Sequence, residues 1–278
     1  MAAKAGFAIV TPASKGLGFA FARHLLANTP LPVVATARTD CDAVKGRLLD
    51  RWDRSGSGDR DRDLEKRLTV LQVDVTDEST IKNMTSTIRD TLPDTPLRLA
   101  LTVPGILNVE KSPAQIDAAA ALDSFRVNSL GPMLLMKHLS AFLPAKSAAA
   151  FPEQEARDGQ LGLPGHAIYA MMAARVGSIS DNGFGGWYSY RASKAAVFQL
   201  AKTFDLFLRT RSKERALAVA MHPGTVQTDF TRDYQDGREM LTPDESAAKL
   251  LRVICGMGPG VNEGRGRCWD WKGEEVLP

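Results

Sequence analysis

The sequence predicts an α/β fold in which helices cover both faces of a doubly wound parallel sheet. Two observations lead to this prediction. Short apolar runs, of the length of buried strands, alternate with longer segments in helical spacing along nearly the whole chain. The first run, residues 6–11, leads into a turn that contains Gly16 and Gly18, and helical spacing begins at Phe19. Backbone N–H groups at such a strand-turn-helix junction can hold a phosphate group.

The predicted strands are about seven in number and form one sheet of the Rossmann type. They occupy residues 6–11, 31–38, 68–73, 97–102, 166–174 and 217–221, with a last strand within residues 264–278. The predicted helices occupy residues 19–26, 78–92, 116–143, 188–209 and 243–254. The third helix contains Gly131 and Pro132, where we expect a break. The last helix begins at a capping box formed by Thr242 and Glu245.

Three segments are expected to be loops. Residues 51–66 are dense in alternating charge with Gly and Ser, which is typical of an exposed loop. Residues 145–165 are rich in Ala, Gly, Pro and acids without a clear period, and we interpret them as an inserted surface loop. Residues 227–245 are expected to form a lid over a site, with apolar side chains such as Phe230 and Leu241. Residues 1–278 together are predicted to be a single domain.

The composition excludes several classes of function. The chain has 278 residues, of which 44% are hydrophobic and 24% charged, and its net charge is +3. The basic residues are dispersed among almost as many acids, so we expect no nucleic-acid partner. Neither a run of about 18 apolar residues nor a cleavable leader occurs, which predicts a cytoplasmic protein with no membrane partner. Three scattered cysteines and four histidines show no ligand spacing, so we expect neither disulfides nor a metal site.

Arg38, at the end of the second predicted strand, indicates which dinucleotide the chain would bind. In a dinucleotide-binding fold an acidic residue near this point accepts from the ribose 2′-hydroxyl, whereas an Arg can pair with a 2′-phosphate. Lys15 in the first turn adds a second cation, so NADP is favoured over NAD despite Asp40. After the third strand, Asp74 could meet the adenine, but an N-cap role for Thr76 or Asp77, before the helix of residues 78–92, is an equally natural interpretation.

Tyr190 and Lys194 are the strongest candidates for chemistry. They lie four residues apart, so in a helix both side chains point from one face. A free phenol titrates near pH 10, and a nearby ammonium is expected to lower its pKa toward working pH. Asn128 is a polar residue in an apolar helix. It either satisfies backbone groups at a helix irregularity or holds a water molecule in an active site, and the spacing favours the first.

Taken together, Tyr190 with Lys194, the Asn128 segment and the Pro223-Gly224 pair resemble the short-chain dehydrogenase/reductase family over almost the whole chain. The stretch ARVGSISDNGFGGWYSYRASK, which ends at Lys194, is similar to the C-factor and sniffer-type carbonyl reductases. The resemblance implies that Tyr190 exchanges a proton with the carbonyl or alcohol oxygen and that Lys194 holds the nicotinamide ribose. Asn128 would position a water that links Lys194 to solvent.

The resemblance also implies which residues bind NADP(H). They are Thr11, Ser14, Lys15, Gly16, Leu17, Gly18, Arg38, Asp74, Val75, Pro104, Gly105, Tyr190, Lys194, Pro223, Gly224, Val226 and Thr228. Family members often pair through two long helices, which are residues 116–143 and 188–209 here. A homodimer or a homotetramer is therefore expected, with a small carbonyl or alcohol as the substrate.

Three departures from the family pattern bear on these expectations. Pro12 replaces the first glycine of the usual turn and removes one N–H donor. The usual Asn-Asn-Ala-Gly after the fourth strand appears as residues 102–105, Thr-Val-Pro-Gly, without the side-chain amide. The Ser that would bind the substrate oxygen at the end of the fifth strand falls on Ala173 or Ala174. Ser178, twelve residues before Tyr190, is the nearest hydroxyl, and we favour it over Ser180 as the fourth catalytic residue.

The sequence therefore predicts an NADPH-dependent reductase of a ketone or aldehyde. Two alternatives stay open. One is a sensor or signalling protein that binds the cofactor on the same scaffold with little catalysis. The other is an isomerase or cyclase that uses Tyr190 without net redox change.

Overall fold

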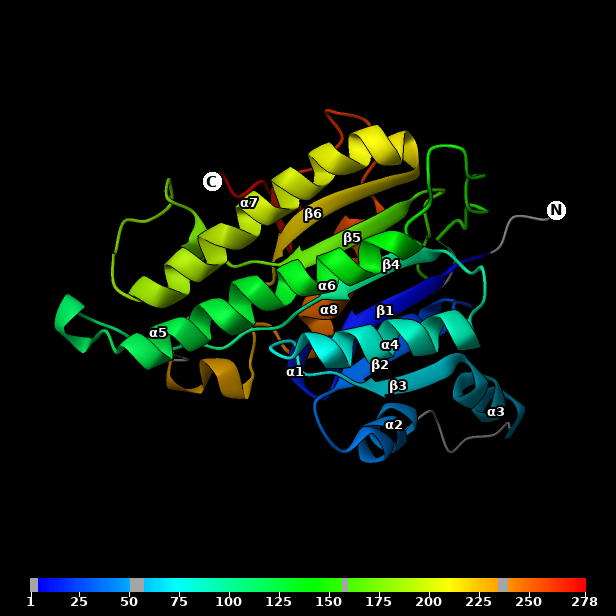
Figure 1. The fold of residues 1–278 in the computed structure, drawn as a ribbon, viewed down its shortest axis with the longest axis horizontal. Coiled ribbons are helices and arrows are strands. Elements are labelled where there is room, and N and C mark those ends of the chain that lie inside the picture. Colours follow the sequence, from blue (N-terminus) through cyan, green and yellow to red (C-terminus); the bar gives the residue numbers. More distant parts are fainter. Residues whose placement is uncertain (1–4, 51–57, 157–159, 235–239) are drawn as a thin grey trace.

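The computed structural model describes residues 5–50, 58–156, 160–234 and 240–278 (Figure 1). Its strands are β1 Phe7–Thr11, β2 Val33–Ala37, β3 Leu68–Gln72, β4 Leu97–Thr102, β5 Ala167–Met172, β6 Ala216–His222 and β7 Cys268–Asp270. They form one seven-stranded sheet in the order β3-β2-β1-β4-β5-β6-β7, and every neighbouring pair is parallel. The predicted fold class and strand number are confirmed.

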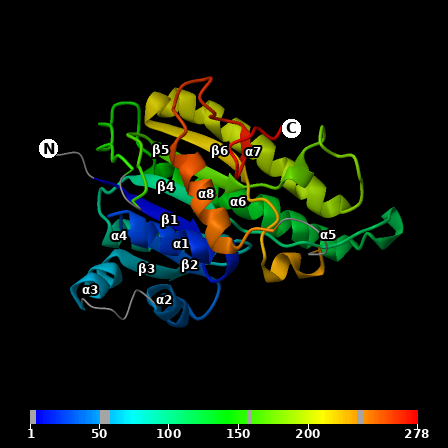
Figure 2. The same ribbon diagram turned by 180° about the vertical axis from the view of Figure 1, so that it is seen from behind.

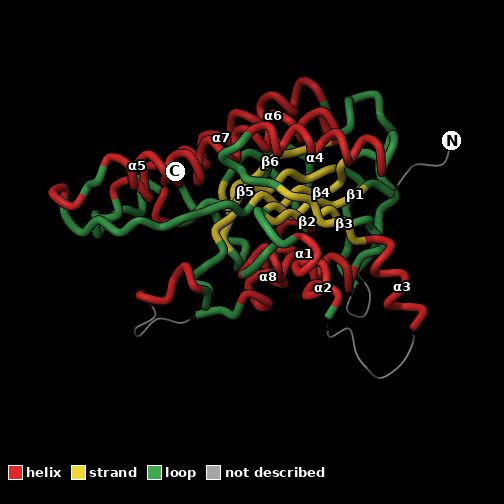
Figure 3. The backbone as a smooth tube through the Cα atoms, turned by 60° about the horizontal axis from the view of Figure 1, so that its bottom comes forward, coloured by secondary structure: helices red, strands yellow, loops and turns green. Residues whose placement is uncertain are grey.

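Helices cover both faces of this sheet. The α-helices are α1 Gly16–Asn28, α2 Cys41–Leu49, α3 Gly58–Arg67, α4 Glu78–Thr91, α5 Ala118–Phe125, α6 Gly131–Leu139, α7 Tyr188–Arg211 and α8 Pro243–Cys255. Helices α4, α6 and α7 lie on one face, and α1, α2 and α8 lie on the other (Figures 2 and 3). Among the described residues, no helix is both long and apolar enough to cross a membrane.

The burial of β1 explains why the strands appear in the sequence as continuous apolar runs. All five residues of β1 are buried. Phe7 and Ile9 belong to the core on the side of α4 and α7, whereas Ala8 and Val10 belong to the core on the side of α1 and α8. Because successive side chains point to opposite faces, a strand covered on both faces has no polar alternation.

The charged segment 51–66 is only partly what the sequence predicted. Residues 51–57 lie outside the described part of the chain, but residues 58–67 form α3, so the prediction of a loop is wrong there. Leu64 is buried, and the guanidinium of Arg67 donates to the carbonyl oxygens of Leu26, Thr29 and Leu31. These contacts with a distant segment stabilise a helix whose composition alone favours a loop.

The helical segment around Asn128 is widened rather than broken. Residues Arg126–Leu130 form a π-helical turn between α5 and α6, and the N–H of Gly131 donates to the carbonyl of Arg126. Pro132 has no N–H to offer the preceding turn, so the wider spacing costs the helix little there. A Cβ on Gly131 would lie 2.9 Å from a methyl carbon of Val75, so only glycine allows this approach. The expected break at Gly131 and Pro132 is therefore a change of helix type just before them.

The inserted segment 145–165 contains no α-helix among its described residues, and residues 157–159 lie outside the described part. Its inner side chains Phe151 and Leu163 are buried. They are anchored by Arg98 of β4, which is 3% exposed and donates to the carbonyl oxygens of Pro152, Leu163 and Pro164. The insertion is thus held on the sheet by a buried guanidinium.

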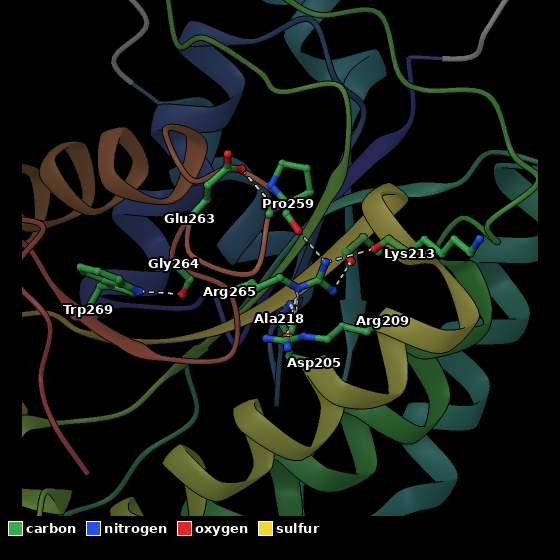
Figure 4. Close-up of polar contacts among 11 residues, drawn as sticks. Asp205, Arg209, Lys213, Ala218, Pro259, Glu263, Gly264, Arg265 and Trp269 are labelled. Carbon is green, nitrogen blue, oxygen red and sulfur yellow. Dashed lines mark hydrogen bonds and ion pairs between the residues drawn. The ribbon is translucent and has the colours of Figure 1, made fainter.

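A buried ion pair joins α7 to the C-terminal part of the fold (Figure 4). Asp205 of α7 is fully buried, and Arg265 donates to both of its carboxylate oxygens at 2.9 and 3.1 Å. Arg209 and the N–H of Ala218 in β6 also donate to this carboxylate. Arg265 uses its remaining donors on the carbonyl oxygens of Lys213, Ala216 and Pro259. Helix α7, strand β6 and the segment before β7 therefore meet at one satisfied polar cluster.

We expect Asp205→Ala to lower the free energy of unfolding by about 3–5 kcal/mol, because it leaves the buried guanidinium of Arg265 without its counter-charge. Urea unfolding at pH 7 measures this loss. The matched control is Glu275→Ala, which removes the partner of Arg267 from an ion pair of 3.1 Å whose side chains are 38% and 31% exposed. The control should cost at most about 1 kcal/mol. Equal losses in the two variants would contradict the role assigned to Asp205.

Candidate active site

The order of the strands in the sheet indicates where the candidate site lies. β1 and β4 are neighbours although they are distant in sequence, and the winding of the chain reverses between them. Ligands of open α/β sheets bind at the carboxyl ends of strands on either side of such a reversal. Thr11 ends β1, and Pro104 and Gly105 follow β4. These predicted cofactor residues therefore lie at the expected edge.

The turn between β1 and α1 retains a phosphate-binding shape. Lys15 precedes α1 in an extended conformation without a side-chain cap, so the first N–H groups of the helix remain available. Gly16 has a φ of 57°, which favours glycine. A Cβ on Gly18 would lie 2.0 Å from the carbonyl oxygen of Pro12, so no other residue fits. Pro12 has lost an N–H, but the next residue, Ala13, still donates to the carbonyl of Thr36 at 2.7 Å.

The structure confirms the helix N-cap at Asp77, while the adenine contact of Asp74 stays a prediction. Asp77 caps α4 by accepting from the N–H of Ser79 at 2.9 Å. Asp74 accepts from both the hydroxyl and the N–H of Thr76, at 2.7 and 2.9 Å. These bonds, with a smaller contribution from Arg38, hold the pKa of the Asp74 carboxyl below its usual range. An exposed Arg38 and an ionised Asp74 thus stand near each other at the ends of β2 and β3.

Tyr190 and Lys194 come together as predicted. Their side chains are buried on one face of α7, and the ammonium of Lys194 lies 6.0 Å from the centre of the Tyr190 ring. Lys194 Nζ donates to the carbonyl of Met172, at the end of β5, at 2.9 Å. The Tyr190 hydroxyl has no hydrogen bond to any described residue. The phenol is therefore free to bond to a ligand.

Burial sets the protonation of this pair. It lowers the pKa of Lys194 to about 8 and raises the pKa of Tyr190 above its ordinary value. The sequence led us to expect a lowered phenol pKa, but burial outweighs the ammonium at this distance. A phenol with a raised pKa stays protonated at pH 7, so the Tyr190 hydroxyl can donate a hydrogen bond in this state.

Asn128 hydrogen-bonds to backbone groups, which is the interpretation that its spacing favoured. These groups belong to the loop after β4 rather than to its own helix. Its amide accepts from the N–H of Ile106 at 2.8 Å and donates to the carbonyl of Ile106 at 2.9 Å. It also donates to the hydroxyl of Ser193 in α7 at 3.0 Å. A Cβ on Gly105 would lie 3.6 Å from Lys194 Nζ and 3.8 Å from Asn128 Oδ1. Asn128 thus fixes the loop after β4 beside Lys194.

The hydroxyl expected to assist Tyr190 is not in contact with it. Ala173 and Ala174 follow the end of β5, and neither has a side-chain hydroxyl. Ser178 lies beyond a 3₁₀ turn, Arg175–Gly177, and its oxygen accepts from the N–H of Asp181 at 3.0 Å. Ser180 donates to the carbonyl of Pro278. No hydrogen bond joins Ser178 to Tyr190 in the described ranges, so its catalytic assignment stays a prediction.

The segment after β6 passes over the candidate site. Thr228 approaches the start of α1, because a Cβ on Gly16 would lie 3.5 Å from its methyl carbon. The Phe230 ring lies 5.8 Å from the Tyr190 ring. The predicted lid, residues 227–245, is not wholly irregular: Asp229–Tyr234 is a 3₁₀ helix, and α8 begins at Pro243. Residues 235–239 lie outside the described part.

Pro223, Gly224 and Val226 connect β6 to this segment. Gly224 has a φ of 79°, and a Cβ there would lie 2.6 Å from Nε1 of Trp271. Val226 pairs with Leu241 in an isolated parallel bridge. Sequence reasoning missed Trp271 as a support of this loop, because nothing in the local pattern links the C-terminal segment to Gly224.

The comparison with family models decides the identity of this fold. The model described as short chain dehydrogenase matches residues 6–170. The chain belongs to the short-chain dehydrogenase family. Within the described residues, no three His, Cys, Asp or Glu side chains are placed to hold a metal ion.

Two curated proteins are similar in sequence to this short-chain dehydrogenase. The C-signal of Myxococcus xanthus is 34% identical over 162 residues, which are 58% of this chain and 80% of that protein. The 1-hydroxy-2-glutathionyl-2-methyl-3-butene dehydrogenase of Rhodococcus sp. (strain AD45) is 39% identical over 89 residues. That match covers 32% of this chain and only 38% of the length of the Rhodococcus protein.

Solved structures of short-chain dehydrogenases share the whole fold. Carbonyl reductase Sniffer of D. melanogaster superposes with a TM-score of 0.76 and 22% identity, over 98% of this chain and 99% of that one. The NADPH-bound carbonyl reductase from chicken fatty liver gives 0.73 and 25%, over 99% and 100%. Together with the C-signal relative, these neighbours confirm the predicted placement beside the C-factor and sniffer-type members.

We expect Lys194→Met to make this short-chain dehydrogenase more stable at pH 7. Burial lowers the pKa of Lys194 from 10.5 to about 8. Between these values the unfolded chain binds more protons than the folded chain, so the Lys194 contribution to the free energy of unfolding rises with pH through this window. The full difference is on the order of 3 kcal/mol. Urea unfolding of wild type and Lys194→Met should show that the variant's gain in the free energy of unfolding is smaller at pH 10 than at pH 7.

The matched control is Lys202→Met, an exposed position on the same helix. It should show no difference from wild type that changes with pH. A Lys194→Met protein that is less stable than wild type at pH 7 would contradict the burial cost assigned to the ammonium.

Proposed function

We propose that this chain is an NADPH-dependent oxidoreductase that reduces a ketone or an aldehyde to an alcohol. The observation that carries the proposal is the buried pair of Tyr190 and Lys194. It lies at the carboxyl ends of β4 and β5, with the Lys194 ammonium near Gly105 and the Tyr190 hydroxyl unbonded among the described residues. Family membership supports an oxidoreductase, and the carbonyl reductase folds support a carbonyl substrate.

The residues present fit NADP(H). The uncapped start of α1 and the close approach of Gly18 to Pro12 suit a diphosphate. Arg38 is exposed where a 2′-phosphate would lie, and Lys15 is 76% exposed with its ammonium 3.5 Å from Asp229. The carbonyl reductase from chicken fatty liver, which shares this fold, has NADPH bound in its crystal structure. Arg38 and Lys15 would bind the phosphates, and Asp74 would lie beside the adenine.

In the proposed mechanism Tyr190 supplies the proton. Bound NADPH would supply the hydride to the carbonyl carbon. Tyr190 holds the carbonyl oxygen by its hydroxyl, and burial keeps this phenol protonated until the oxygen becomes basic. Lys194, largely protonated at pH 7 with a pKa of about 8, stabilises the phenolate that remains. We propose that Asn128 positions the water that returns a proton by way of Lys194.

The walls around Tyr190 favour an apolar substrate. The rings of Trp187 and Phe230 lie 6.1 and 5.8 Å from the Tyr190 ring. Ala173 or Ala174 stands where the family has a hydroxyl for the substrate oxygen, so orientation of the substrate would depend more on these rings. A carbonyl compound with an aromatic or aliphatic body suits this arrangement.

We also propose that the chain forms a homodimer or homotetramer in the cytoplasm. Large apolar side chains are exposed on two neighbouring helical segments. They are Leu122, Phe125, Leu130 and Met133 on α5, the π turn and α6, and Leu206 and Phe207 on α7. Such a surface suits a symmetric interface between copies.

A cofactor-binding sensor with little catalysis is the second candidate. It is favoured by the alanine, Ala173 or Ala174, at the position of the family's hydroxyl, and by the C-signal relative, whose name describes a signal. Tight NADPH binding with no turnover of any carbonyl would favour this candidate. An isomerase or cyclase would turn over its substrate without consuming NADPH.

We expect Tyr190→Phe to lower kcat by about 10²–10⁴-fold with little change in the Kd for NADPH, because only the transferable proton is removed. Initial rates with a panel of aromatic ketones, and NADPH fluorescence titration, measure the two quantities. Tyr188→Phe, which changes a half-exposed phenol two residues away, is the control and should keep its rate. Full activity in Tyr190→Phe would remove this phenol from the mechanism.

Arg38→Ala is expected to weaken NADPH binding by about 10–100-fold, the loss of one charge-assisted contact of about 1.5–3 kcal/mol. NADH binding should change little, because NADH has no 2′-phosphate. Fluorescence titration with both nucleotides makes NADH the internal control. Equal losses for the two would show that Arg38 does not contact the 2′-phosphate.

A further inference from the structure

The loop after β4 holds the start of α7, and one of its residues has no role so far. We propose that Glu110 is a positioning residue for Tyr190, a role that rests on the reductase function proposed above. Its side chain is 3% exposed although it is a carboxylate. Oε2 accepts from the N–H of Ser189 at 2.8 Å, and the Glu110 carbonyl accepts from the N–H of Trp187 at 2.6 Å.

Glu110 supplies a cap that the helix itself lacks. Trp187, at the N-cap position of α7, has a left-handed backbone with a φ of 51° and no capping side chain. A Ser, Thr, Asp or Asn at this position would accept from the first turn. Trp187 instead places its ring 6.1 Å from the Tyr190 ring. The acceptor therefore comes from a residue 77 positions earlier in the chain.

The residue before Tyr190 is held at two points. The N–H of Ser189 is bonded to Glu110, and its hydroxyl lies 3.3 Å from the hydroxyl of Ser124 in α5. Asn108, in the same loop as Glu110, donates to Ser124 at 3.0 Å. Tyr190 is the third residue of α7, so fixing Ser189 fixes the direction of the Cα–Cβ bond that carries the phenol.

The charge of Glu110 also suits this place. A carboxylate at a helix N-terminus is stabilised by the helix dipole and by the N–H groups it accepts from. Oε1 has no partner among the described residues and is fully buried. An unpartnered buried oxygen costs stability. The bond that Oε2 accepts from the N–H of Ser189 offsets part of that cost. A Gln in its place keeps the accepting oxygen without the charge.

The test compares Glu110→Ala, Glu110→Gln and Glu110→Asp in the full chain. Hydrogen exchange at residues 187–192 should become at least about tenfold faster in Glu110→Ala and stay near wild type in Glu110→Gln. With an aromatic ketone and NADPH, kcat should fall about 10–100-fold in Glu110→Ala while the KM for NADPH changes little. Glu110→Gln should restore kcat to within about threefold of wild type, and Glu110→Asp, one methylene too short, should resemble Ala.

Asp117→Ala is the matched control, because Asp117 caps the neighbouring helix α5 by accepting from Ala120 at 2.9 Å. It should speed exchange in α5 alone and leave kcat unchanged. The proposal is overturned by unchanged exchange at residues 187–192 in Glu110→Ala, by unchanged kcat there, or by equal damage in Gln and Ala.

The exchange measurement separates this proposal from the proposed function. If wild type reduces no carbonyl, the reductase function fails, and the exchange pattern still decides whether Glu110 holds the first turn of α7. If Glu110→Ala does not fold, the contrast between Gln and Asp carries the same test. Recovery in Gln with loss in Asp supports the contact, and identical behaviour of the two overturns it.

Discussion

Helix α7 carries both Tyr190 and Lys194, and the buried carboxylate of Asp205 fixes its far half against Arg265 and β6. Tyr190 and Asp205 lie 15 residues apart in sequence, which in an α-helix is about 22 Å. Between them, Gly177 lets a 3₁₀ turn approach so closely that a Cβ would lie 2.7 Å from the carbonyl carbon of Lys194. The helix therefore has little freedom to shift, and the backbone that carries Tyr190 and Lys194 is held in place.

Burial shifts the pKa values of Lys194 and Tyr190 in opposite directions, and both shifts favour the neutral side chain. A neutral phenol is ready to donate, and a lysine that titrates near pH 8 can both hold and release a proton. The same burial makes Lys194 a cost to the fold, and the proposed reductase function would account for that cost.

The sequence predicted those parts of the molecule that depend on local pattern. Buried strands such as β1, the glycine turn at Gly16 and Gly18, and the helical spacing of Tyr190 and Lys194 all follow from short-range rules. It was wrong or silent where distant segments, or local turns without a periodic pattern, decide the structure. Helix α3 depends on Arg67 reaching the carbonyls after α1, and the bond between Asp181 and Ser178 depends on a turn that periodicity does not reveal.

The contact between Gly224 and Trp271 has a consequence for how the protein is made. The loop that carries Pro223 and Val226 is supported by a side chain beyond β7, the strand that follows all others in chain order. Trp271 comes after β1 to β6 in chain order, so this loop lacks its backing in a nascent chain until residue 271 has been synthesised. A chain interrupted before β7 would hold Tyr190 and Lys194 without the support for the loop at Gly224.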